Sequence, residues 1–140
     1  MKIVLIACCS KKLASESIVK DLYISTLFKY SYLYAKQIKP DYIFVLSAKY
    51  GLLKMDDVIK PYNETLNKKS KSEKEEWANK VILQLKEYVN LDKDQVIFLA
   101  GLNYRKFLID NIKRFDIPMI GLSIGKQLQY LRKQLDNTSN

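Results

Sequence analysis

The sequence predicts an α/β fold, a three-layer sandwich in which helices flank a mostly parallel sheet of about four to five strands. Two observations support this prediction. Short apolar runs are continuous rather than alternating, as in strands covered on both faces. Helical patterns lie between and after these runs, the order that right-handed crossovers require. The length suits one domain, which we assign to residues 1–136, with a frayed tail at 137–140.

The apolar runs define the strands. Three of them are bounded by polar or turn residues and have the length of a buried strand. A shorter run around Pro118 is expected to form a fourth strand. The predicted strands are Ile3–Ala7, Tyr42–Leu46, Gln95–Ala100 and Ile117–Ile120.

Four helices are expected in the intervening segments. The first has one apolar face and ends before Pro40. The second is expected to begin near Ser72, because Ser72 and Glu75 have capping-box spacing. Lys54–Lys71 lacks a regular pattern, and a connection of this length is usually functional or mobile. The predicted helices cover about 24–38, 72–88, 102–114 and 124–135.

Charge and composition limit the possible functions. The formal net charge is +9, as in many nucleic-acid-binding proteins, but only three of the 24 basic residues are arginine. The charge therefore indicates either a polyanionic partner or a solvated lysine surface. The chain contains no histidine, which excludes a Ser-His-Asp triad, a Cys-His dyad and a histidine-bearing metal site within it.

The two cysteines, Cys8 and Cys9, are neighbours and match no zinc spacing. We therefore expect reduced thiols in the cytoplasm, with no metal and no cofactor. No apolar run approaches the ~20 residues that span a bilayer, so no membrane association is expected.

Candidate binding residues follow the predicted strands. Ligands of open parallel sheets bind at the carboxyl ends of the strands, where loops from distant parts of the chain meet. The four loops that follow the predicted strands each carry small residues, a lysine or arginine, and hydroxyl, amide or thiol groups. The alternative is that these are ordinary turns and surface residues, because turns need glycine and surfaces carry lysine. The candidate ligand-binding residues are Ser10, Lys11, Ser47, Lys49, Tyr50, Gly51, Tyr62, Gly101, Asn103, Tyr104, Arg105, Gly125 and Lys126.

Two residues are candidates for catalysis. Cys9 follows the first strand beside Lys11 and Lys12, which would lower the pKa of a thiol, although it also suits a small buried position. Glu64 lies in the polar-aromatic segment PYNETL and is a candidate nucleophile or proton shuttle, or simply a loop charge.

One stretch, LSAKYGLLKMDDVIKPY, resembles a hallmark of the YaaA-like peroxide-stress superfamily. The matching residues are Ser47, Tyr50, Gly51, Leu53, Asp57, Pro61 and Tyr62, and Ala100, Tyr104 and the loop after the first strand also fit. Where that superfamily has an arginine and a glutamate after Pro-Tyr, this chain has Asn63 and Thr65, so no catalytic glutamate carries over. The resemblance implies a minimal bacterial or phage domain acting in a nucleic-acid or nucleotide context, in stress response or phage–host conflict.

Two functional hypotheses follow. The first is an enzyme directed at a nucleotide or nucleobase, acting at an N-glycosidic bond or on a base substituent, with Lys11, Lys49 and Arg105 holding phosphate. The second is a protein without catalysis that binds DNA or RNA through the basic Lys54–Lys71 segment, or sequesters a small nucleotide. The sequence does not predict an oligomeric state.

Overall fold

The computed structural model describes residues 1–137, and it contains a five-stranded sheet with the order β4-β3-β1-β6-β7. Neighbouring strands are parallel except for β3 and β4. The strands of this sheet are β1 (Lys2–Ala7), β3 (Tyr42–Ser47), β4 (Gly51–Lys54), β6 (Gln95–Leu99) and β7 (Arg114–Asp116). The predicted fold class, a mostly parallel sheet with flanking helices, is confirmed.

The remaining elements are helices and a small second sheet. Strands β2 (Ser17–Ile18) and β5 (Val58–Ile59) form an antiparallel pair. The helices are α1 (Val19–Leu22), α2 (Thr26–Ile38), α3 (Lys71–Lys86), α4 (Leu102–Arg105) and α5 (Ile124–Asn137), with 3-10 turns η1 (Leu66–Lys68) and η2 (Ile109–Asn111).

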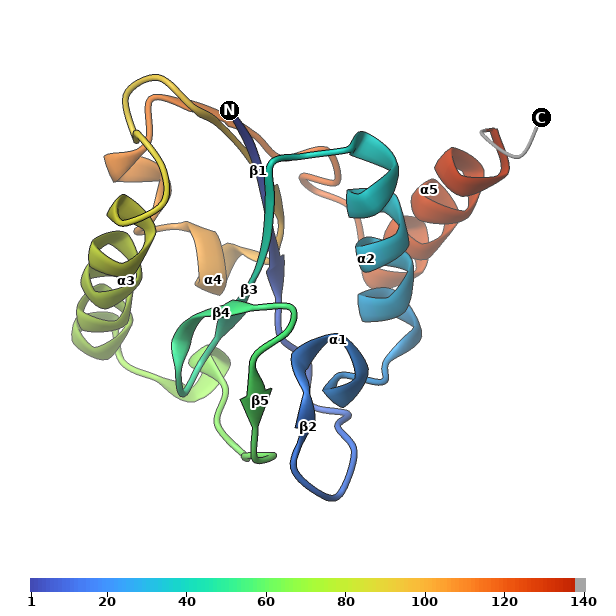
Figure 1. Cartoon of the computed structure of the whole chain (residues 1–140), viewed down its shortest axis with the longest axis horizontal. Helices are drawn as coiled ribbons and strands as arrows, with labels where there is room; N and C mark the ends of the chain where they lie inside the picture. Colours follow the sequence, from blue (N-terminus) through green and yellow to red (C-terminus); the bar gives the residue numbers. More distant parts are fainter. Residues whose placement is uncertain (138–140) are drawn as a thin grey trace.

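Helices cover both faces of the large sheet (Figure 1). α3 and α4 lie on one face, and α2 and α5 lie on the other. Because side chains alternate along a strand, Ile3 and Leu5 of β1 enter the core under α3, whereas Val4 and Ile6 enter the core under α2. This double burial explains why the strands appear as unbroken apolar runs.

The predicted fourth strand at Ile117–Ile120 is wrong, because the strand precedes it as β7 (Arg114–Asp116). Residues 117–122 form consecutive turns, in which the Ile120 and Leu122 amides donate to the carbonyls of Ile117 and Met119. Pro118 has no amide hydrogen to donate to a ladder, so it favours a turn at this point.

The helix predicted at 102–114 is also wrong beyond its first turn. α4 ends at Arg105, and the chain continues through turns and η2 to β7. Tyr104, Leu108 and Ile112 have helical spacing and are all buried in the core under α3. Separate turns place these three side chains in one core, so the spacing alone did not require a continuous helix.

The capping box of α3 lies two residues before the predicted position. The Ser70 hydroxyl accepts from the Glu73 amide at 3.2 Å, and the Glu73 carboxylate accepts from the Ser70 amide at 3.1 Å. The sequence KSKSEKE contains the serine-x-x-glutamate spacing twice, so the pattern could not distinguish the two registers.

The carboxyl end of the chain also differs from its prediction. α5 continues through Asn137, the first residue of the expected tail, and residues 138–140 of that tail lie outside the described residues. Within residues 1–137, every helix is too short or too polar to cross a bilayer.

Gly51 opens β4 and turns the chain back along β3, a hairpin that the sequence did not predict. Its φ of 79° is in the left-handed region, and a β-carbon there would collide with the side-chain amide of Gln84. That amide is fixed in place because its oxygen accepts from the Leu52 N–H at 2.9 Å. Both conditions require glycine at this turn.

We expect Gly51→Ala to lower the free energy of unfolding by about 2–3 kcal/mol, through backbone strain and displacement of Gln84. Gly121 has a similar φ of 76° but open space around it, so Gly121→Ala is expected to cost only about 1 kcal/mol. Urea denaturation of both variants measures the difference. Equal losses would show that the contact with Gln84 contributes nothing.

Candidate binding site

A cluster of buried hydroxyl groups lies where β3 ends. The Tyr62 and Tyr23 hydroxyls are 2.6 Å apart, and the Ser47 hydroxyl donates to Tyr62 at 2.7 Å. The Ser47 oxygen accepts from the amides of Tyr50, at 3.0 Å, and Lys49, at 3.3 Å. Either tyrosine can donate in the bond between Tyr62 and Tyr23. This chain of hydrogen bonds joins three segments that are distant in sequence.

Local pairing brings these segments together. The antiparallel pair of β2 and β5 returns the chain after the β3–β4 hairpin, and Tyr62 follows β5 by three residues. A bridge between Lys12 and Tyr23 holds the loop after β1 beside the segment before α2. The Lys12 ammonium group then lies 4.4 Å from the centre of the Tyr62 ring.

The hydroxyl cluster favours neutral tyrosines. Burial raises the pKa of Tyr62 and of Tyr23 above the usual tyrosine range, and nearby Cys8 raises both further. In the same region the Cys8 thiol donates to the Tyr104 hydroxyl at 3.6 Å. Burial, with the nearby Cys8 thiol, raises the pKa of Tyr104 to about 12. The cluster therefore holds these phenols as hydrogen-bonding groups, not as anions.

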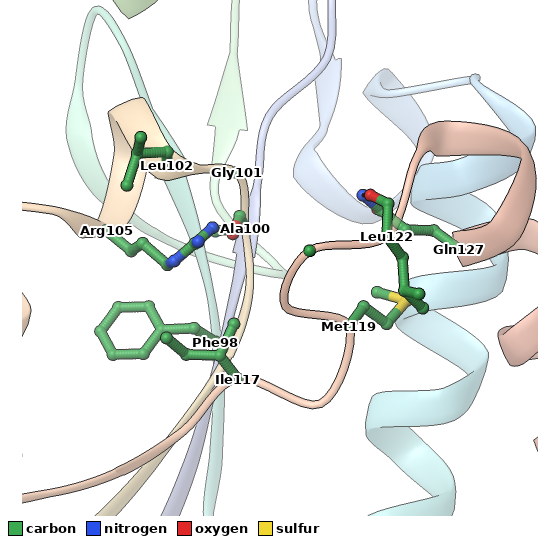
Figure 2. A pocket seen from close by; sticks show the side chains of 10 residues that line it. Phe98, Ala100, Gly101, Leu102, Arg105, Ile117, Met119, Leu122 and Gln127 are labelled. Atoms are coloured by element: carbon green, nitrogen blue, oxygen red, sulfur yellow. Dashed lines mark hydrogen bonds between the residues drawn. The ribbon is translucent and has the colours of Figure 1, made fainter.

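A pocket of about 220 Å³ lies between the ends of β6 and β7 (Figure 2). Arg105 enters it from α4, opposite Met119, Leu122 and Gln127. One guanidinium nitrogen of Arg105 donates to the Ala100 carbonyl at 2.9 Å. Among residues 1–137, Arg105 forms no ion pair with a carboxylate, so its remaining donors are available to an anion.

A second pocket, of about 80 Å³, adjoins the first at the carboxyl end of β1. Cys8, Cys9 and Ser25 contribute to its wall. The two pockets share Ala100, Gly101 and Gln127, and the Gln127 amide nitrogen donates to the Leu122 carbonyl at 2.9 Å. The side-chain oxygen of Gln127 therefore remains as an acceptor between the two pockets.

The model of the family DUF6884, described as a family of unknown function, matches residues 3–133. The chain belongs to DUF6884. No match to a curated protein and none to a solved structure was found. The resemblance to the YaaA-like superfamily is therefore corrected, because the family that covers nearly the whole chain is DUF6884. Several residues that suggested it have structural roles in this fold, as the hydrogen bonds of Ser47 and the strained turn at Gly51 illustrate.

In this DUF6884 chain, part of the predicted set gathers at the carboxyl edge of β1, β3 and β6. Arg105, Gly101 and Cys9 line the two pockets. Four more predicted residues belong to the neighbouring tyrosine-rich cluster, namely Ser47, Tyr50, Tyr62 and Tyr104.

Other predicted residues lie elsewhere or on the surface. Glu64 lines a separate open pocket of about 350 Å³ beside α3, with Trp77 and Lys80. Asn103 accepts from the Lys74 ammonium at 3.1 Å and so links α4 to α3. The residues that are exposed in their loops or at the start of α5 are Ser10, Lys11, Lys49, Gly125 and Lys126. Gly51 contacts Gln84 on the side of α3.

Sequence reasoning missed Cys8, Lys12, Tyr23 and Gln127. Cys8 contacts Tyr104, whereas the thiol of Cys9 donates to the Lys11 carbonyl at 3.2 Å. Likewise Lys12, and not exposed Lys11, lies over Tyr62. Neighbouring side chains of an extended segment point to opposite sides. Continuing the alternation of β1 into the loop was therefore the available signal for choosing Cys8 over Cys9 and Lys12 over Lys11. Within residues 1–137, no three acidic or cysteine side chains gather as metal ligands.

Proposed function

We propose that the two adjoining pockets bind a nucleotide, with its phosphate at Arg105 and its base or sugar towards Gln127 and the cysteines. The observation that carries this proposal is a half-buried arginine in a pocket, without a carboxylate partner among the described residues. A guanidinium presents several donors in one plane and suits phosphate oxygens. The oxygen of Gln127 would accept from a hydroxyl or amino group of the ligand.

The test is a thermal-shift and calorimetric titration with nucleoside monophosphates and with inorganic phosphate. A ligand that binds only the folded state raises the melting temperature as its concentration exceeds its Kd. We expect Arg105→Ala to weaken nucleotide binding at least about tenfold, the loss of one charge-assisted contact. Arg132→Ala removes the same charge from the exposed face of α5 and is expected to bind normally.

Two results would contradict the nucleotide proposal. One is that no nucleotide protects the wild-type protein at about 5 mM, where even a weak site is occupied. The other is that Arg105→Ala binds as tightly as wild type. Protection by inorganic phosphate alone would reduce the proposal to an anion site.

The proposal extends from nucleotide binding to catalysis. Cys9 lies at the pocket, while Glu64 lies beside α3, so we propose Cys9 as the candidate for covalent or proton-transfer work at an N-glycosidic bond or a base substituent. Mass spectrometry of each nucleotide before and after incubation separates turnover from tight sequestration. We place this activity in the cytoplasm, where the free thiols of Cys8 and Cys9 stay reduced.

DNA or RNA binding is the second candidate, favoured by the net charge of +9. Two of the lysines near α3 have carboxylate neighbours, since Lys69 lies 3.8 Å from Glu73 and Lys71 lies 3.9 Å from Glu75. These pairs reduce the local positive charge, so we favour the nucleotide pocket. Substitution of Lys68, Lys69 and Lys71 by alanine, with a salt titration, tests the alternative.

A further inference from the structure

The two edges of the large sheet differ in how their backbone groups are satisfied. At β4, the Leu52 amide donates to the Gln84 side chain at 2.9 Å, and the Lys54 amide donates to Asp57 at 2.8 Å. These side chains protect that edge from pairing with another strand.

The opposite edge, β7, lacks this protection. Its three residues are exposed and pair with β6 on one side only. Among residues 1–137, no side chain caps the backbone groups of β7. The nearest amide that is bonded outside the sheet belongs to Lys113, the residue just before β7, and it donates to the Leu91 carbonyl. An open edge strand is a template for another strand.

The sequence of β7, Arg-Phe-Asp, is complementary to itself. If two copies pair antiparallel about a two-fold axis through Phe115, Arg114 of each copy faces Asp116 of the other. Opposite charges in facing positions stabilise an antiparallel pair. Arg114 has no ion pair among the described residues, and Phe115 is 39% exposed, although its ring packs edge-on against Phe98. Asp116 is exposed and accepts from the Gln95 side chain with one carboxylate oxygen, so its other oxygen can meet Arg114 of the second copy.

We propose that β7 is a homodimer interface that joins two copies of the sheet into one continuous ten-stranded sheet. Pro118 follows β7 by two residues and has no amide hydrogen, so the ladder stays short. A short interface buries less area than a permanent dimer needs. The dimer is therefore weak and depends on protein concentration, with a Kd of about 0.1 mM. This inference is independent of the nucleotide pocket.

The test is analytical ultracentrifugation of the full chain from about 10 µM to 1 mM, a range that spans the expected Kd. Arg114→Asp replaces two attractive pairs with two repulsive ones and is expected to raise the dimer Kd about tenfold or more. The double variant Arg114→Asp/Asp116→Arg restores both pairs and the net charge, and is expected to dimerise within about threefold of wild type.

The control is Lys29→Glu, which changes the net charge as much as Arg114→Asp but lies on the exposed side of α2. It is expected to leave the Kd unchanged within about twofold. Three results would each overturn the proposal: a wild-type monomer at the highest concentration, a dimer insensitive to Arg114→Asp, or a double variant that fails to recover. Circular dichroism confirms that each variant is folded.

Discussion

Trp77→Ala is expected to lower the free energy of unfolding by about 3–5 kcal/mol, the largest effect of any substitution considered for this protein. Trp77 projects from α3 into the core and is only 8% exposed. Its indole N–H donates to the Ser47 carbonyl at 2.8 Å, and its ring meets Tyr104 edge-on at 5.8 Å. The substitution therefore leaves a cavity and also detaches α3 from the end of β3.

Two further variants separate the contributions to the Trp77 effect. Trp77→Phe keeps an aromatic ring but leaves the buried Ser47 carbonyl without its donor, an expected cost of about 1–3 kcal/mol. Leu83→Ala on the same helix removes a side chain that is 66% exposed and is expected to cost less than about 0.5 kcal/mol. Denaturant unfolding measures all three. A loss below about 1 kcal/mol for Trp77→Ala would contradict the packing role assigned to this residue.

The central strands could be predicted because their sequence and their environment agree. β1, β3 and β6 are neighbours in the middle of the sheet, and helices bury both faces of each. The residues in the middle of such a strand each meet a core on one face or the other, so the apolar run is continuous and easily recognised. α2 was similarly clear, because its apolar face and the proline after it define both ends.

The short strands could not be predicted, because their pairing depends on distant residues. β2 and β5 have two residues each and pair across about 40 positions, while β7 is exposed along its length. None of them has an apolar period long enough to recognise. Tyr23 entered the hydroxyl cluster through such pairing, since the bridge to Lys12 places it there.

The location of the site was predictable, but its inner residues were not. Arg105 and Gly101 follow β6 and line a pocket there, and Gly101 also meets the loop after β1, as the carboxyl-edge argument predicts. The choice between Cys8 and Cys9 depends on the direction of each side chain where β1 ends. Gln127 lies in a helix that begins after several turns, so no strand-end argument identified it.

Tyr62→Phe is expected to lower the free energy of unfolding at neutral pH by about 1–3 kcal/mol. The substitution removes the central hydroxyl of the cluster, so the buried Ser47 proton loses its acceptor and the Tyr23 hydroxyl loses its hydrogen-bond partner. Guanidinium unfolding measures the loss. The matched control, Tyr42→Phe, removes a hydroxyl that is exposed on β3 and is expected to cost less than about 0.5 kcal/mol.

The same variant also tests the electrostatics of the cluster at high pH. Burial raises the folded-state pKa of Tyr62 and Tyr23 above the ordinary value of 10.0, so the unfolded chain loses these protons first. Stability is therefore complete below about pH 10 and falls as the pH rises above it, by about 1.4 kcal/mol per pH unit for each such tyrosine. Tyr62→Phe removes one of these groups, so its stability should fall less steeply between pH 10 and 11 than that of wild type. An unchanged slope would mean that Tyr62 ionises as readily in the folded protein as in the unfolded chain.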